Sequence, residues 1–373
     1  MKYYLIAGEA SGDLHGSNLM KAIEKQDPNA NFRFWGGDLM EAVGGTQVMH
    51  YKERSFMGFL EVITNIGTAL NNIKHCKKDI EAFNPDALIF IDYSGFNLRI
   101  AKWAKPNGYS THYYITPQVW ASREKRVQDI KRDIDHMYVI LPFVKDFYQN
   151  KHQMDVDFVG HPLIDAIENR DSFNADEFKR NYQLDDRPII ALLPGSRKQE
   201  IKKMLSVMLS MIPHFNEYQF VIGGAPSQEE AFYKSIIKYA DVAFVPNKTY
   251  DLLSVARAAL VTSGTATLET ALFKVPQVVC YKGSWLSYQI AKRIITLKYI
   301  SLVNLIVDKP LVTELIQGDL NSKRLRNELN HILQETNRIE ILNEYDLLIE
   351  ELGGGGASAK AAALIIKNID KSK

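Results

Sequence analysis

The stretch 192–200 constrains the fold of this chain more than any other, because it joins a strand to a helix through a turn suited to an anion. An apolar run, 189–193, predicts a buried parallel strand, and apolar residues at helical spacing follow in 201–212. Gly195 lets the backbone approach a ligand closely, and Arg197 offers a planar fork of donors for phosphate. An ordinary strand-to-helix connection with a solvated arginine explains the same residues equally well.

A second stretch, 261–269, repeats this arrangement and favours anion binding. The apolar strand 258–261 runs through a turn of small residues into a helix that begins near Thr265. The carboxylate of Glu269, in the first turns of that helix, suits a ribose diol. The expected backbone donors at the helix N-terminus are those of Gly264, Thr265, Ala266 and Thr267. Two such turns in one half of a chain predict a site for a nucleotide diphosphate.

Strands and helices alternate along both halves of the chain, which predicts an α/β fold with a parallel, doubly wound sheet in each half. In the second half we expect strands at 188–193, 219–222, 242–245, 258–262 and 277–281, and helices at 200–212, 227–239, 249–257, 265–273 and 285–296. After residue 305 the chain is expected to be helical, with a break at Gly353 to Gly356. The predicted domains are 1–163 and 164–345, followed by a helical segment, 346–373.

Composition excludes several classes of protein. The 45 Lys and Arg residues and 44 Asp and Glu residues leave a net charge of +1, so no strong field attracts nucleic acid. Cys76 and Cys280 lack metal-ligand spacing and are too few for a disulfide framework, which predicts a reducing, cytoplasmic compartment. The N-terminus lacks the pattern of a signal peptide, and no stretch is long and apolar enough to cross a membrane.

Polar residues follow two predicted strands in the first half. Ser11 and Asp13 lie after the opening strand, at the start of a helix, where binding a ligand and capping the helix are both reasonable roles. Asp92 follows the buried strand 87–91, and ligands of open α/β sheets bind at such carboxyl ends. A turn or capping role is the alternative for Asp92. No G-x-G-x-x-G or G-x-x-x-x-G-K-[ST] motif occurs, which argues against dinucleotide oxidoreductases and P-loop enzymes.

Three further patterns carry weaker signals. Apolar residues recur at helical spacing from Phe59, with lysines up to Lys78, which predicts an amphipathic helix that packs on its own domain or touches an anionic membrane. A basic helix with five cations between Arg123 and Arg132 follows the strand 112–115; most of these charges are expected to be solvated, and a few could contact an acidic ligand. The pair Asp155 and Asp157 matches the D-x-D of metal-dependent glycosyltransferases, but it lies in a predicted strand, and no metal site is predicted.

Taken together, these motifs resemble the lipid-A-disaccharide synthase family over nearly the full length. The matching stretches are 7–13, 56–59 with Glu61, 91–92 with 96–97, 119–121 with 125–127, 160–161, 192–197 with Glu200, 263–266 with 268–269, and 301–302 with 304–305. The chain departs from the family at Tyr93-Ser-Gly95 and at Val303, where prolines are common, which affects turn geometry rather than any side chain with a proposed chemical role. The resemblance implies a GT-B glycosyltransferase whose active site lies in a cleft between the two domains.

The resemblance also implies the reaction. A UDP-linked 2,3-diacylglucosamine would donate its sugar, with inversion, to 2,3-diacylglucosamine 1-phosphate, forming the β(1→6) disaccharide. The expected roles are Asp92 as base, Arg197 and the amides of Gly264 to Thr267 on the diphosphate, and Glu269 on the ribose, with Ser11, Asp13, Ser196 and Asn304 in the substrate site. No cofactor is expected. Both substrates carry acyl chains, so we expect peripheral association with the inner membrane. The alternatives are a UDP-sugar epimerase or hydrolase on the same fold, and a non-catalytic UDP-sugar sensor.

Overall fold

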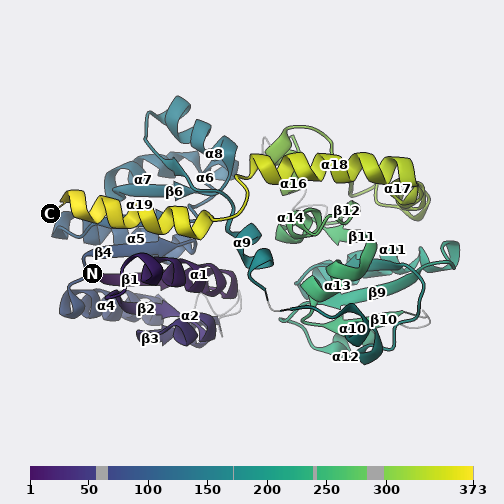
Figure 1. The fold of residues 1–373 in the computed structure, drawn as a ribbon, viewed down its shortest axis with the longest axis horizontal. Coiled ribbons are helices and arrows are strands. Elements are labelled where there is room, and N and C mark those ends of the chain that lie inside the picture. Colours follow the sequence, from purple (N-terminus) through teal and green to yellow (C-terminus); the bar gives the residue numbers. More distant parts are fainter. Residues whose placement is uncertain (56–65, 171, 238–241, 284–297, 373) are drawn as a thin grey trace. The chain divides into compact units, whose positions relative to one another are not determined.

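A computed structural model describes the chain except for residues 56–65, 171, 238–241, 284–297 and 373, and it divides into two compact units. The first unit consists of Met1–Arg170 together with Leu352–Lys373, and the second is Asp171–Glu351 (Figure 1). Each unit is built around one parallel sheet, as the alternation of strands and helices predicts.

The sheet of the first unit has seven strands in the order β3-β2-β1-β4-β5-β6-β7, and every neighbouring pair is parallel. The strands are β1 (Lys2–Ala7), β2 (Asn31–Gly36), β3 (Thr46–His50), β4 (Ala87–Ile91), β5 (Thr111–Tyr114), β6 (His136–Val139) and β7 (Asp157–Phe158). The order reverses between β1 and β4, so the connections that leave these two strands diverge. Such a switch point opens a crevice at the carboxyl edge of the sheet.

Helices cover both faces of this sheet, because alternate residues of each strand point to opposite sides. They are α1 (Ala10–Gln26), α2 (Asp38–Val43), α3 (Lys52–Ser55), α4 (Ile66–Phe83), α5 (Ser94–Ala104), α6 (Val119–Ser122), α7 (Val127–Asp133), α8 (Pro142–Asp146), α9 (Pro162–Glu168) and α19 (Ala357–Ser372), with short turns η1 (Lys105–Asn107), η2 (Glu124–Arg126) and η3 (Phe147–Lys151). Leu5 of β1 packs in one core cluster with residues of α1 and α19, whereas the hydroxyl of Tyr4 donates to Asp79 of α4 at 2.8 Å.

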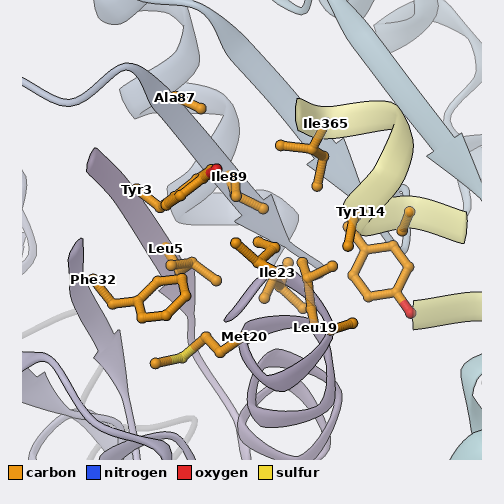
Figure 2. Close-up of a cluster of buried hydrophobic side chains, with 14 of the residues drawn as sticks. Tyr3, Leu5, Leu19, Met20, Ile23, Phe32, Ala87, Ile89, Tyr114 and Ile365 are labelled. Atoms are coloured by element: carbon orange, nitrogen blue, oxygen red, sulfur yellow. The ribbon is translucent and has the colours of Figure 1, made fainter. Parts of the chain in front are cut away.

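The C-terminal helix α19 completes the core of the first unit. Its Ile365 is buried in the same cluster as Leu19 and Tyr114 (Figure 2). The carboxylate of Asp165 in α9 accepts hydrogen bonds from the backbone N–H groups of residues 356, 357 and 358 and so caps this helix. The last segment of the chain therefore belongs structurally with the first.

The sheet of the second unit has six parallel strands in the order β10-β9-β8-β11-β12-β13. The strands are β8 (Ile189–Leu193), β9 (Gln219–Gly224), β10 (Ala243–Pro246), β11 (Ala256–Thr262), β12 (Gln277–Tyr281) and β13 (Thr313–Ile316). The helices are α10 (Ala175–Asn181), α11 (Lys198–Leu209), η4 (Ile212–His214), α12 (Glu230–Lys234), α13 (Thr249–Val255), α14 (Thr265–Leu272), α16 (Leu302–Val307), α17 (Ser322–Leu333) and α18 (Glu335–Glu351). Here the strand order reverses between β8 and β11.

Several boundaries differ from those expected from the sequence. The first unit extends to Arg170 because α9 packs against α1 and α19, and α18 runs through the expected boundary at 345/346. Strand β13 interrupts the segment expected to be helical. Strand β7 begins at Asp157, so Asp155 precedes the strand instead of lying within it. The expected helix 285–296, and the start of the amphipathic helix before Ile66, lie outside the described residues.

Candidate functional site

A pocket in the second unit lies at the carboxyl ends of β8, β9 and β11. Its lining includes Leu193, Gly223 and Thr262, the residues at or next to the ends of these three strands. The two turns expected to bind an anion therefore meet in one pocket, at the reversal of strand order where ligands of open α/β sheets bind. Of the residues predicted to bind substrate, the pocket is lined by Ser196, Gly264, Thr265, Ala266 and Glu269.

The turn after β8 requires glycine. Gly195 has φ +102°, and a Cβ atom there would lie 3.0 Å from Oε2 of Glu200 and 3.4 Å from Cγ2 of Thr262. Its backbone can therefore approach the pocket in a way that residues with side chains cannot. The carbonyl of Ser196 accepts hydrogen bonds from Ser227 Oγ at 3.0 Å and Gln228 Nε2 at 2.9 Å, which fix the turn to the connection after β9.

Arg197 lies at the N-cap of α11 and does not line this pocket. Its side chain is 83% exposed, and Nη1 donates to Oε1 of Glu200 at 3.0 Å. Glu200 does line the pocket. The carboxylate of Glu200 therefore lines a pocket proposed for an anion, and Arg197 neutralises this carboxylate from outside the lining.

The helix α14 begins at the pocket without a side-chain cap. Gly264 is its N-cap residue and supplies no side chain to accept from the first N–H groups, so these donors are available to a ligand. Thr267 is fully buried, and its hydroxyl donates to the carbonyl of Gly264 at 2.8 Å. Its side chain therefore holds the helix start, and its backbone N–H also donates to the Gly264 carbonyl, at 3.2 Å.

Glu269 is half-buried on the pocket side of α14, and its Oε1 accepts from the hydroxyl of Tyr250 at 3.0 Å. Burial raises the pKa of Glu269, and the hydrogen bond from Tyr250 opposes that rise. This hydrogen bond uses Oε1 of Glu269, so Oε2 is the oxygen that could accept from a diol. Neither Tyr250 nor the pocket residues Gly223, Ala225 and Thr249 was singled out from the sequence; the Gly223-Gly224 pair at a strand end was the signal that could have identified this third connection.

Asp92 follows β4 in the first unit and has an unusual backbone. It adopts φ 45° and Tyr93 φ 46°, whereas residues other than glycine rarely take positive φ. The Asp92 carbonyl accepts from Asn97 Nδ2 at 2.9 Å and from the Tyr113 hydroxyl at 2.5 Å, which holds this conformation. Backbone strain of this kind clusters at functional sites. Ile115, at the end of the neighbouring strand β5, also has positive φ, 59°.

The carboxylate of Asp92 is exposed and shares its surroundings with Glu9, the N-cap residue of α1. Partial removal of water raises the pKa of Asp92, the negative charge of Glu9 raises it further, and a hydrogen bond from the Tyr93 backbone opposes both. Ser11 is exposed in the first turn of α1. Because β1 and β4 flank the reversal of strand order, Glu9, Ser11 and Asp92 all follow the strands at the switch point.

Two residues expected in the substrate site are occupied by structural bonds. The buried carboxylate of Asp13 accepts from the backbone N–H groups of Gly37, Leu39 and Met40, so it caps α2 and not its own helix. Asn304 is buried, and its side chain bonds the backbone of Val312 and Oε1 of Glu314. Both side chains tie separate elements together, which favours a supporting role for them.

The part of the chain that the structure describes has neither a metal-binding cluster nor a membrane-spanning helix. They contain no group of three or more His, Cys, Asp or Glu side chains placed to hold a metal ion. Within the same part of the chain, no helix has the length and hydropathy needed to cross a bilayer.

Comparison with known families and relatives gives one consistent result. Residues 3–367 match the family described as Lipid-A-disaccharide synthetase. The lipid-A-disaccharide synthase of Syntrophus aciditrophicus is 40% identical over 377 residues, covering 99% of this chain and 98% of the relative. That of Geobacter sulfurreducens is 35% identical over 375 residues, covering 98% and 97%.

Solved structures with low sequence identity share the fold. A UDP-GlcNAc 2-epimerase from Neisseria meningitidis bound to UDP-GlcNAc has a TM-score of 0.67 at 12% identity and covers 100% of both chains. The calicheamicin glycosyltransferase CalG4 has a TM-score of 0.58 at 14% identity, covering 99% of this chain and 98% of its own. These likenesses confirm the predicted α/β fold of the GT-B type and do not separate epimerase from transferase. The family match does so, because it spans nearly the whole sequence: the chain belongs to the lipid-A-disaccharide synthase family of glycosyltransferases.

Proposed function

We propose that this chain transfers 2,3-diacylglucosamine from its UDP-linked form to the 6-hydroxyl of 2,3-diacylglucosamine 1-phosphate, with inversion, releasing UDP. The observation that carries the proposal is the full-length match to one synthase family, in a chain that has a pocket at the switch point of the second unit. Inversion by a single displacement requires a base for the acceptor hydroxyl and stabilisation of the departing diphosphate.

In this proposal Asp92 accepts the proton of the acceptor hydroxyl. The diphosphate binds at the Gly195 turn and the free N–H groups of α14, with Arg197 as the cation, and Glu269 binds the ribose. Helix N-termini and an arginine can stabilise a diphosphate without a metal ion. Ser11 and Ser196 remain candidates for contacts with substrate, and we assign Asp13 and Asn304 to positioning.

Product analysis tests the proposal against an epimerase, a hydrolase and a sensor. Radiolabelled donor should give a labelled disaccharide only when the acceptor is present, and the yield should persist in the presence of a metal chelator. Labelled free sugar or an epimer, formed without acceptor, would identify the alternative enzymes. Binding of UDP-sugar with no product of any kind would identify a sensor.

We also propose that the protein is cytoplasmic and associates peripherally with the inner membrane. Leu70 of α4 is 57% exposed, and Lys74 and Lys78 are exposed at four-residue spacing after it, so the three share one face of the helix. An apolar residue beside lysines is suited to an anionic membrane surface. Ile63 and the side chain of Ile66, which the sequence also suggested for this contact, lie outside the described residues.

Leu70→Ser should weaken binding to vesicles that contain anionic lipid several-fold, and adding Lys74→Gln should cost about 1 kcal/mol more. Co-sedimentation with vesicles measures both effects. Leu347→Ser is the matched control, because Leu347 of the second unit is exposed to a similar extent, 56%. Equal losses from Leu70→Ser and Leu347→Ser, or no loss from either, would rule out α4 as the docking helix.

A further inference from the structure

A short turn in the first unit carries three cations that form no ion pair with any residue the structure describes. Arg123, Lys125 and Arg126 lie in and next to η2, and among the described residues none of them forms an ion pair or a side-chain hydrogen bond. The cations that follow are engaged: Lys131 donates to the carbonyls of residues 152 and 153, and Arg132 bonds Asp129 and Asp133. Unneutralised charge is therefore concentrated in η2 and not spread along the basic helix.

The only carboxylate of this turn is directed elsewhere. Glu124 bonds Nζ of Lys151 at 2.7 Å and Nε2 of His152 at 3.1 Å, both at the end of η3. The backbone N–H of Arg126 donates to the carbonyl of Arg123, so these two residues lie next to each other at the two ends of the turn, and Glu124 stands between them in the sequence. Two guanidinium groups carried by adjacent residues can together bind the oxygens of a phosphate monoester.

The turn is held in place from both sides. Val119 before it and Val127 after it are buried, and the backbone N–H of Arg126 donates to the carbonyl of Arg123 at 3.0 Å. Trp120 packs edge-on against Phe143 at 4.8 Å between ring centroids. A turn anchored in this way loses little backbone entropy when it binds a ligand.

The turn also belongs to the edge of the sheet that carries Asp92. It lies on the connection that leaves β5 at Tyr114, and the backbone N–H of Asp92 donates to the carbonyl of Tyr114 at 3.2 Å. In the proposed acceptor, the reacting 6-hydroxyl and the 1-phosphate are at opposite ends of the sugar. The group that accepts the proton and the group that binds the phosphate are therefore expected on two neighbouring connections, which here are those that follow β4 and β5.

We propose that Arg123 and Arg126, with Lys125 beside them, bind the phosphate of the acceptor substrate. This inference rests on the proposed function, which it deepens by assigning the two phosphate groups to different units: the donor diphosphate to the pocket of the second and the acceptor monophosphate to η2 of the first. The cluster acts in binding and takes no part in the displacement itself.

Kinetics with two acceptors test the inference. In micelles of a neutral detergent, Arg123→Gln and Arg126→Gln should each raise the KM for the phosphorylated acceptor about tenfold to a hundredfold, with kcat and the KM for the donor little changed. With an acceptor that lacks the 1-phosphate, the wild type should show a similarly raised KM, and the two variants should show no further rise. Arg132→Gln removes the same charge from an already paired, exposed position and should leave the kinetics unchanged.

Each contrary result has its own meaning. An unchanged KM in both variants, or a loss of equal size with both acceptors, would overturn the inference, since the phosphate would not be what the cluster recognises. A loss seen only on anionic vesicles would also overturn it and assign the charges to the membrane surface. A raised KM for the donor would place the donor diphosphate here instead. Absence of disaccharide with the wild-type protein would overturn the proposed function itself, and this inference with it.

Discussion

Asp92→Asn is expected to lower turnover by at least about a hundredfold, since the loss of a general base typically costs about 10²–10⁴-fold. The asparagine side chain keeps the shape and hydrogen-bonding capacity of the aspartate but cannot accept a proton. Asparagine also tolerates the left-handed backbone found at this position, φ 45°, so the variant should keep the local conformation. Initial rates with both lipid substrates measure the effect, and UDP affinity should change little.

Stability and pH dependence separate this role from a structural one. The pKa of Asp92 is raised, first by partial removal of water and then by the charge of Glu9. At a pH above this pKa the carboxylate is ionised, and its charge destabilises the folded protein relative to the unfolded chain. Asp92→Asn removes this charge and should leave the melting temperature equal or slightly higher, whereas loss of a cap would lower stability by about 1 kcal/mol. Because a base must be ionised, wild-type turnover should fall as pH decreases through the raised pKa.

Asp129→Asn is a suitable control, since Asp129 is a 59% exposed carboxylate on α7, away from the strand ends. It should retain wild-type turnover. If Asp92→Asn keeps more than a tenth of wild-type turnover, the base lies elsewhere. Glu9 would then be the next residue to test, because its charge acts on Asp92 and it follows the neighbouring strand β1.

The elements that could be predicted are those whose signal is local. The apolar runs of β4 and β8 and the small-residue turns at Gly195 and Gly264 are contiguous in the sequence, and both turns line the pocket. Strand β13 was missed because its four residues, 313–316, lack an apolar run and gain their place by pairing with β12.

Interactions between distant residues could not be read in the same way. The carboxylate of Asp13 caps a helix that begins 25 positions later, at Asp38, and the sequence near Asp13 gives no sign of this partner. The left-handed conformations of Asp92 and Ile115 are imposed by their surroundings, since neither residue type favours positive φ strongly enough to predict it. Tertiary context therefore decided which of the polar residues at strand ends remain free for substrate.

Arg197→Ala is expected to lower kcat/KM on the order of a hundredfold, as loss of a group that stabilises developing charge does in other enzymes. Arg197→Lys should also lose most activity, because a point charge cannot replace a planar fork on a diphosphate. The side chain is 83% exposed and its ion pair with Glu200 is of the kind that contributes little to folding, so the melting temperature should not change. Lys203→Ala, at an exposed position of α11 six residues further along the chain, is the control and should retain activity.

The contact with Glu200 allows a second variant to separate two explanations of such a loss. Glu200 lines the pocket, so without Arg197 its carboxylate would repel the diphosphate whether or not the guanidinium touches the ligand. If Arg197 binds the diphosphate directly, the double variant Arg197→Ala/Glu200→Gln should recover only a small part of the lost kcat/KM. Recovery close to the wild-type value would mean that Arg197 acts only by neutralising Glu200. Near-normal turnover of Arg197→Lys on its own would show instead that Arg197 is a surface charge, and the diphosphate would then be held by the backbone of the Gly195 turn and of α14.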